Sequence, residues 1–438
     1  MTSNDAKGLV RAIGRWSLTA LVINSIIGSG IFGLPSSMAG LLGTRSPLGV
    51  LLAGLAVAPV IACYAEVSSY FAEAGGPYLW TRTAFGPLIG LETGWLLWLV
   101  RLTAPAANAN LFVNYLAEFW PSAKDPLPRT VVLTLLLGLL ALINYRGVRA
   151  GMQVSNLFTI AKLLPLLIVI VGGVLYATAG HQAVFTAQPP SEVKLWLQGL
   201  LLFIFAYGGF EGALVVMAEA QNPKRDAPFA LFTALTVCVL VYTLVQWVVV
   251  HVLPDPVHSD RPLADAARLF MGGGGAALIS FGALISTYGY LSANSLVVPR
   301  VTFAFAEEGD FPRIFAAVHR RFHTPHFSIL FFAVLVWLFA LLGNFSWNVT
   351  LSAVARLFFY AFGCAALPVL RRKQPGGGAW FRLPGAIVFV ALGILVSIVL
   401  ATRIDMSGSL ILGATMFVAF INWLLVRKRN ARKSALAS

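Results

Sequence analysis

The sequence predicts an all-α integral membrane protein, and three observations lead to that prediction. Hydrophobic residues make up 58% of the 438 residues and charged residues only 11%, whereas a soluble domain carries about 25% charged residues. Apolar runs of about the length that a bilayer-spanning helix needs recur along the whole chain. The lysines and arginines behind the net charge of +14 lie mostly in short segments between these runs. Because a nucleic-acid-binding protein gathers its cations on one face, nucleic acid is not an expected partner.

Twelve apolar runs are predicted to form transmembrane helices. They lie at residues 16–41, 47–71, 86–119, 130–144, 152–178, 195–220, 228–252, 276–304, 327–342, 349–370, 383–402 and 409–426. An even number of spans places both termini on the same side of the membrane. With the termini inside, the cytoplasmic segments hold 21 of the 31 lysines and arginines and the outer segments hold seven. The positive-inside rule therefore predicts a multi-pass protein of the cell (plasma or inner) membrane, with segment 1–15 and a basic tail, 427–438, in the cytoplasm.

The first predicted helix contains a stretch that weakens a helix. Residues 24–35 read NSIIGSGIFGLP, so Gly28, Gly30 and Gly33 spell G-x-G-x-x-G. A dinucleotide site needs a preceding strand and an acid about 20 residues further on, but an apolar run precedes this stretch and the next acid is Glu66. In lipid, a helix break is tolerated only where it is buried in protein or lines a cavity. We expect such a break near mid-membrane, while close helix packing remains the alternative role for these glycines.

A second break is predicted in the sixth helix. Residues 205–212 read FAYGGFEG and place Gly208, Gly209 and Gly212 around Glu211. Interrupted helices in corresponding positions of two halves are typical of inverted repeats. The first repeat would be residues 16–178 (helices 1–5) and the second 195–370 (helices 6–10), with helices 11 and 12 appended at 383–426. The half-helix N-termini attract an anion and the freed carbonyls a cation, so an α-amino acid fits both.

Four motifs in register with the helix count carry a family resemblance. They are GSGIF in helix 1, CYAEVSSYFAEAGGPY at 63–78, EAQNPKRDAP at 219–228 and PRVTFAFAEEGDFPRIF at 299–315. The chain resembles an amino acid permease of the amino acid–polyamine–organocation superfamily, and is similar to arginine/agmatine antiporters and cationic amino acid transporters. The resemblance implies the leucine-transporter fold and secondary active transport of amino acids by alternating access. A transporter of polyamines or other organic amines, or a transporter-derived sensor, is the alternative.

The resemblance also implies which residues bind the substrate. Ser29, Gly30 and Ile31 would offer donors to its carboxylate, and carbonyls near the two breaks would take its amine. Phe205 matches an aromatic gate in the antiporters, although an aromatic side chain at this spacing can also be part of the core. Glu211 matches an acid in the same antiporters. The expected substrate-binding residues are Ile26, Ile27, Gly28, Ser29, Gly30, Ile31, Phe205, Ala206, Gly208 and Glu211.

Ionisable residues inside the apolar runs are costly and need a reason, since each costs at least about 2.5–3.5 kcal/mol at the bilayer centre. Arg101 in helix 3 could pair with Glu211 or face the substrate, whereas snorkelling or structural pairing is the expected role of Arg356, which lies nearer the outer end of helix 10. By resemblance, Lys162 in helix 5 takes the place of the sodium ion of sodium-coupled relatives and bonds helix-1 carbonyls. This predicts sodium-independent transport, by proton-coupled symport or exchange. Glu211 either carries a proton in coupling or stays ionised as a latch between helices 3 and 6.

Acids near the inner ends of the helices have structural expectations only. Glu92 is expected to be a structural partner, and Glu66 and Glu219 are expected in a cytoplasmic gate network. The three cysteines fall inside apolar runs, so no disulfide, metal site or cofactor is expected. The helices contain no HExxH and no Ser/His pair, which argues against an enzyme. The sequence leaves open which amino acid or amine is carried, whether transport is symport or exchange, and the oligomeric state.

Overall fold

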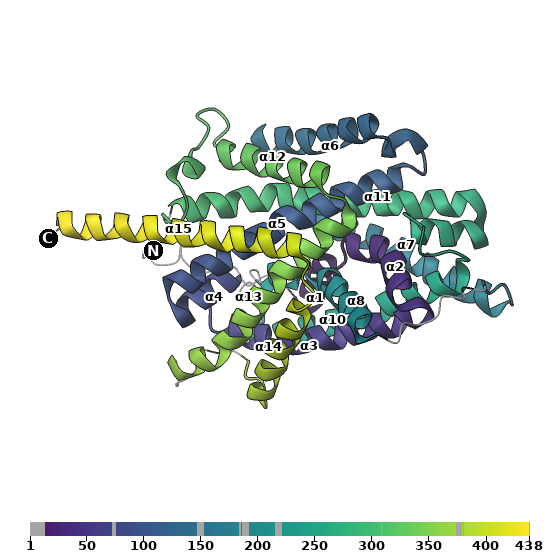
Figure 1. The fold of residues 1–438 in the computed structure, drawn as a ribbon, viewed down its shortest axis with the longest axis horizontal. Coiled ribbons are helices and arrows are strands. Elements are labelled where there is room, and N and C mark those ends of the chain that lie inside the picture. Colours follow the sequence, from purple (N-terminus) through teal and green to yellow (C-terminus); the bar gives the residue numbers. More distant parts are fainter. Residues whose placement is uncertain are drawn as a thin grey trace, which may run out of the picture.

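The computed structural model describes residues 14–71, 76–146, 153–183, 185, 192–214, 221–307, 309–373, 379 and 381–437, and within these ranges all regular structure is helical (Figure 1). The α-helices are α1 (Arg15–Ile26), α2 (Ser29–Leu42), α3 (Ser46–Ser69), α4 (Gly76–Phe85), α5 (Pro87–Leu116), α6 (Pro126–Arg146), α7 (Gln153–Thr178), α8 (Val193–Tyr207), α9 (Phe210–Ala213), α10 (Pro223–Val252), α11 (Pro262–Glu307), α12 (His326–Leu342), α13 (Phe345–Lys373), α14 (Ala386–Ala401) and α15 (Met406–Ala437). Short 3₁₀ helices are η1 (Gly43–Arg45), η2 (Pro121–Lys124) and η4 (Arg313–Ala316). The predicted all-helical class is confirmed.

Many of these helices are long and apolar enough to cross a bilayer. By length and composition, eight stretches of the described chain qualify: Ser29–Ser69, Pro87–Leu116, Pro126–Arg146, Val193–Gly212, Arg225–Val252, Pro262–Glu307, Phe345–Lys373 and Met406–Arg427. Shorter apolar helices are Lys162–Thr178, His326–Leu342 and Ala386–Ala401. The chain is therefore an integral membrane protein, because a water-soluble fold could not bury so many long apolar helices.

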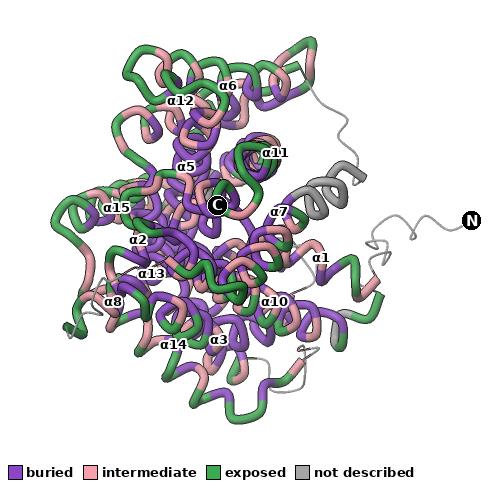
Figure 2. The backbone as a smooth tube through the Cα atoms, turned by 90° about the vertical axis from the view of Figure 1, so that its right-hand side faces the viewer, coloured by how far each residue is buried: buried purple, intermediate pink, exposed green. Residues whose placement is uncertain are grey.

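Large apolar residues are also exposed on the peripheral helices, and Figure 2 colours exposed positions green, for example along α6. Leu127 on α6 is 75% exposed, Ile387 on α14 is 70% exposed and Leu410 on α15 is 66% exposed. A monomeric soluble protein rarely exposes contiguous apolar surface of this kind. Lipid tails are the solvent that such a surface fits.

The described residues form one large apolar core and two smaller ones. Helices α1, α2, α3, α8, α10 and α13 contribute to the large core, which includes the buried residues Phe32, Tyr64 and Phe203. The second core lies where α5 and α11 meet α6 and α12, around Leu133, Leu291 and Phe332. In Figures 1 and 2, α6 and α12 accordingly form a separate layer over α5 and α11.

Several element boundaries differ from the sequence expectation. Helix α6 begins at Pro126 and so is longer than the apolar run 130–144, because proline is well suited to the first turn of a helix. Helix α11 begins at Pro262, before the run 276–304, and changes direction at Gly272, whose φ is +68°. Helix α4 was not expected as a separate helix, and α15 continues through most of the predicted tail to Ala437.

Both predicted helix breaks are present. Helix α1 ends at Ile26 and α2 begins at Ser29, so Ile27 and Gly28 form the first interruption. Helix α8 ends at Tyr207 and α9 begins at Phe210, so Gly208 and Gly209 form the second interruption. Gly209 has a φ of +111°, a conformation that L side chains rarely adopt. The glycine-rich stretches therefore interrupt helices where the sequence predicted it.

Candidate functional site

The two helix interruptions pack directly against each other. A Cβ atom added to Gly30 would lie 2.8 Å from the Ala206 Cβ, closer than carbon atoms normally approach. A Cβ atom added to Gly209 would overlap the Ser25 carbonyl oxygen. The Tyr242 hydroxyl on α10 joins the two interruptions, lying 3.2 Å from the Ile26 carbonyl oxygen and 3.3 Å from that of Ala206. The ends of four half-helices therefore meet in one place.

The N-terminus of α2 offers donors for an anion. The first N–H groups of a helix have no partner within it, and those at the start of α2 belong to Ser29, Gly30 and Ile31. The Ser29 hydroxyl is buried and has no hydrogen-bond partner among the described residues. The geometry agrees with the predicted carboxylate-binding role of these three residues, which stays a prediction.

Carbonyl groups at the first interruption hold the ammonium of Lys162. The side chain extends from α7, is 3% exposed, and donates to the Ile27 carbonyl at 3.1 Å and the Asn24 carbonyl at 3.4 Å. These contacts agree with the expectation that Lys162 bonds helix-1 carbonyls, and its role in place of a sodium ion stays a prediction. At the second interruption the Phe205 carbonyl accepts the Gly208 N–H at 3.2 Å. Since a carbonyl oxygen has two lone pairs, each of these groups can still accept from a ligand amine.

The Glu211 carboxylate is held by three donors. Its Oε2 atom accepts the Gly209 N–H at 2.8 Å and the Tyr360 hydroxyl at 3.4 Å. Its Oε1 atom lies 3.3 Å from Nε of Arg356 on α13, and both side chains are buried. The ion-pair partner of Glu211 is thus Arg356, for which snorkelling or structural pairing was expected, rather than Arg101.

Glycines at and just after the second interruption make room for the two arginines. A Cβ atom on Gly208 would overlap the Arg356 guanidinium, and one on Gly212 would lie 3.1 Å from an Arg101 Nη atom. The Arg356 guanidinium carbon also lies 5.6 Å from the centre of the Phe205 ring, within the range of a cation–π contact. Phe205 therefore packs beneath a buried cation at the site, and its gating role stays a prediction.

Residues that the sequence analysis missed complete the site. Besides Tyr242 and Tyr360, they are Tyr290 and Asn294, both on α11. A Cβ atom on Gly28 would lie 3.7 Å from the Tyr290 ring, and Asn294 Oδ1 accepts from Arg101 Nη1 at 3.4 Å. Their only sequence signal is a polar atom within an apolar run, which many structural residues share.

A separate charged network connects the helix ends that the sequence analysis expected on the cytoplasmic side. Both Glu66 oxygens accept from Arg371 at 2.7 Å, and one also accepts the Leu383 N–H at 2.7 Å. Nearby elements contribute a cluster of Tyr78, Arg82 and Asp310. Burial, and then the hydrogen bond with Asp310, raises the pKa of Tyr78, so its hydroxyl remains a donor. This arrangement agrees with the expected gate role of Glu66, which stays a prediction.

Two other acids named in the sequence analysis give less information. Glu219 lies outside the described residues. Glu92 is buried, and its Oε2 atom has no hydrogen-bond partner in the described part of the chain. The structure therefore gives no support for the expectation that Glu92 is a structural partner.

Comparison with known proteins places the chain among membrane permeases. Residues 13–426 match the family model described as amino acid permease. The chain is similar to three proteins of Bacillus subtilis (strain 168), each 27% identical: a methylthioribose transporter, a branched-chain amino acid permease and a serine/threonine exchanger. The matches cover 87%, 97% and 87% of this chain and 86%, 93% and 88% of those proteins, respectively.

Proposed function

The chain belongs to the amino acid permease family, and we propose that it is a secondary active transporter that moves amino acids across the membrane by alternating access. Transport is independent of sodium and proceeds by proton-coupled symport or by exchange. The observation that carries the proposal is the pair of packed helix interruptions. It offers unpaired N–H groups of α2 to a carboxylate and carbonyls of both interruptions to an amine, which are the two charges that every α-amino acid carries.

The proposed architecture is twelve spans with a 5+5 inverted repeat. Its support is a second internal correspondence besides the two interruptions. The short helix α4 precedes Gly86, with φ +93°, and then the long helix α5. The short helical segment 262–271 precedes Gly272, with φ +68°, and then the long part of α11. The same succession of short helix, positive-φ glycine and long helix thus recurs at matching places in the two halves.

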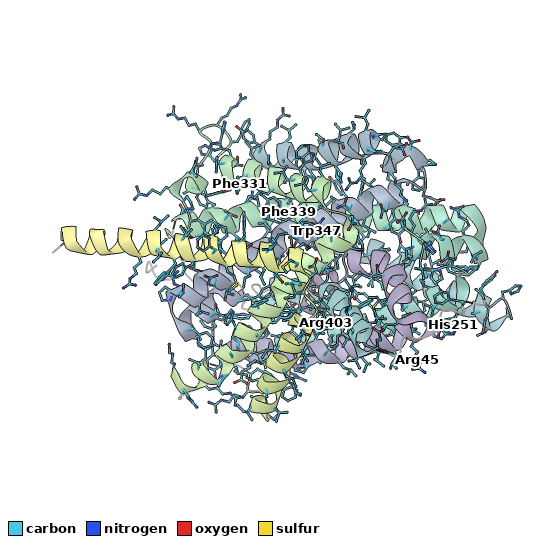
Figure 3. All side chains as sticks on the ribbon, in the orientation of Figure 1. Arg45, His251, Phe331, Phe339, Trp347 and Arg403 are labelled. Carbon is cyan, nitrogen blue, oxygen red and sulfur yellow. The ribbon has the colours of Figure 1, made fainter. Side chains whose placement is uncertain are left out.

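The proposed topology places both termini in the cytoplasm, and the proposed membrane is the plasma or inner membrane. The support is the distribution of cations, with 21 on the side of the termini and seven on the other. In the orientation shared by Figures 1 and 3, Arg45 and His251 lie toward the right, whereas α15 runs to the left. This separation agrees with Arg45 and His251 on the outer side.

Lys162 replaces a coupling sodium ion in this proposal. Its ammonium bonds the Ile27 and Asn24 carbonyls, which are groups that would otherwise coordinate a cation where helix 1 is interrupted. The fixed positive charge leaves sodium no favourable place beside it. Uptake should therefore be the same in sodium and in choline buffer at constant pH, and a sodium requirement would contradict the proposal.

Glu211 acts in coupling or as an ionised latch, and the contacts favour the latch. Three donors converge on its carboxylate, an arrangement that stabilises the charged form. Transport by Glu211→Gln across pH 5 to 8 separates the two roles. A coupling role flattens the pH profile while substrate binding is retained, and a latch leaves the shape of the profile unchanged.

The decisive experiment is transport of labelled amino acids into proteoliposomes that contain the purified protein. Uptake driven by an imposed inward proton gradient, with the outside acidic, supports symport, and uptake that requires internal amino acid supports exchange. Gly30→Val protein of normal fold is the negative control, since its side chain would fill the contact with Ala206. Absence of uptake and exchange for all amino acids, with binding of polyamines instead, would overturn the proposal.

A further inference from the structure

The charges around the second interruption do not balance. Arg356 and Glu211 form a buried ion pair. The charge of Arg101 acts on the same carboxylate from α5, and its head group lies against Gly212. Lys162 is turned to the carbonyls of Asn24 and Ile27 at the other interruption. Two guanidinium groups therefore face one carboxylate at this end of the site.

Arg101 is the guanidinium without a counter-charge. None of the ion pairs in the described ranges involves it. Its one hydrogen bond there, to Asn294 Oδ1, is long at 3.4 Å, although a guanidinium has five N–H donors. A charge within a transmembrane bundle is costly unless it is paired or serves a ligand. No carboxylate of the described residues pairs with Arg101, so its position is suited to an anion that a ligand would bring.

The site already has separate donors for the α-carboxylate. Those donors are the N–H groups at the start of α2, beside the interruption at Ile27 and Gly28. Arg101 lies at the other interruption, next to Gly212 on α9. A ligand anchored by its carboxylate at α2 would therefore present its side chain toward α5, α9 and α11.

We propose that this site selects amino acids with an anionic side chain, and that Arg101 binds the side-chain carboxylate. The inference rests on the proposed function as an amino acid transporter. A bidentate guanidinium–carboxylate contact would supply the missing counter-charge. A cationic side chain would instead meet Arg101 and Arg356 together, and a neutral one would leave Arg101 unpaired.

The test compares acids with their isosteric amides in proteoliposomes. Uptake or exchange of L-aspartate and L-glutamate should exceed that of L-asparagine and L-glutamine by at least tenfold, with L-leucine, L-serine and L-arginine as further competitors. In Arg101→Gln protein, the affinity for the acids should fall at least tenfold and that for the amides should change little. The matched control is Arg45→Gln, which removes an exposed arginine from the short helix η1 and should keep the wild-type preference.

The outcomes separate this inference from the proposed function. Transport of neutral amino acids or of arginine in preference to the acids would overturn the inference and leave the function intact, whereas no amino acid transport at all would overturn the function. An equal loss for acids and amides in Arg101→Gln would mean that Arg101 binds the α-carboxylate, which also overturns the inference. If Arg101→Gln does not fold, Arg101→Lys should keep a preference for acids, and loss of that preference in folded protein would count against it.

Discussion

The buried ion pair of Glu211 and Arg356 allows a quantitative prediction. At 3.3 Å and an effective dielectric constant of about 20, the Coulomb attraction is about 5 kcal/mol, before the cost of removing both groups from water is subtracted. Breaking a buried pair by removing one partner typically costs about 3–5 kcal/mol, because an uncompensated charge remains. Glu211→Gln leaves Arg356 and Arg101 facing each other without a carboxylate. We expect this substitution to destabilise the folded protein by about 3–5 kcal/mol.

The two partners are not equivalent, which makes the prediction sharper. Arg356→Gln leaves Glu211 with the Gly209 N–H and with the charge of Arg101, so its loss of stability should be clearly smaller. The double variant removes both charges and should recover much of the loss caused by Glu211→Gln. The measurement is the unfolding of purified protein in detergent, by heat and by denaturant, for the two single variants and the double variant. Equal losses in the single variants, or a double loss equal to their sum, would refute the reasoning.

Three further predictions follow from contacts at and below the site. Gly30→Val should abolish substrate binding, whereas the control Gly138→Val should not, because a Cβ atom at Gly138 has no neighbour within 4 Å. Substrate binding is measured on both folded variants, and retained binding in Gly30→Val would contradict the prediction. Tyr242→Phe removes the hydroxyl between the interruptions and should weaken substrate affinity about 3- to 20-fold, as expected for a loss of roughly 0.6–1.7 kcal/mol. An affinity within twofold of wild type in a binding titration would count against this prediction. Glu66→Gln should weaken the network of Glu66 with Arg371 and the Leu383 N–H and speed labelling of the buried Cys63 thiol by a membrane-permeant maleimide. The labelling rate is measured by mass spectrometry, and an unchanged rate would argue against a gate.

The sequence was sufficient for the all-helical class and for the positions of the two interruptions. Apolar length predicts a spanning helix because a bilayer offers the backbone no partner, and three glycines within six residues weaken a helix wherever they stand. The same criterion of apolar length missed the amphipathic helix α4 and the start of α11. Neither is a long apolar run, so the criterion that finds spanning helices does not detect them.

Lys162 could be placed from the sequence, but the partner of Glu211 could not. The resemblance tied Lys162 to the carbonyls of helix 1, and the Ile27 carbonyl does accept from it. No spacing rule relates Glu211 to Arg356, which are 145 residues apart on elements whose packing only the tertiary structure gives. A similar estimated depth in the membrane pointed to Arg101 as the partner of Glu211, because depth does not determine which side of a helix faces the site.

The second interruption links the helix break to the charges around it. Gly208 leaves space for Arg356 and Gly212 leaves space for Arg101, while Gly209 has a backbone conformation that favours glycine and packs against the Ser25 carbonyl. Gly208, which ends α8, therefore admits the guanidinium group from α13, and Gly212, within α9, admits the one from α5. A side chain at Gly208 or Gly212 would displace an arginine as well as alter the backbone. Since movement of α9 would change the distances from Glu211 to both arginines, the conformational state of this interruption and the electrostatic environment of the proposed substrate site are coupled.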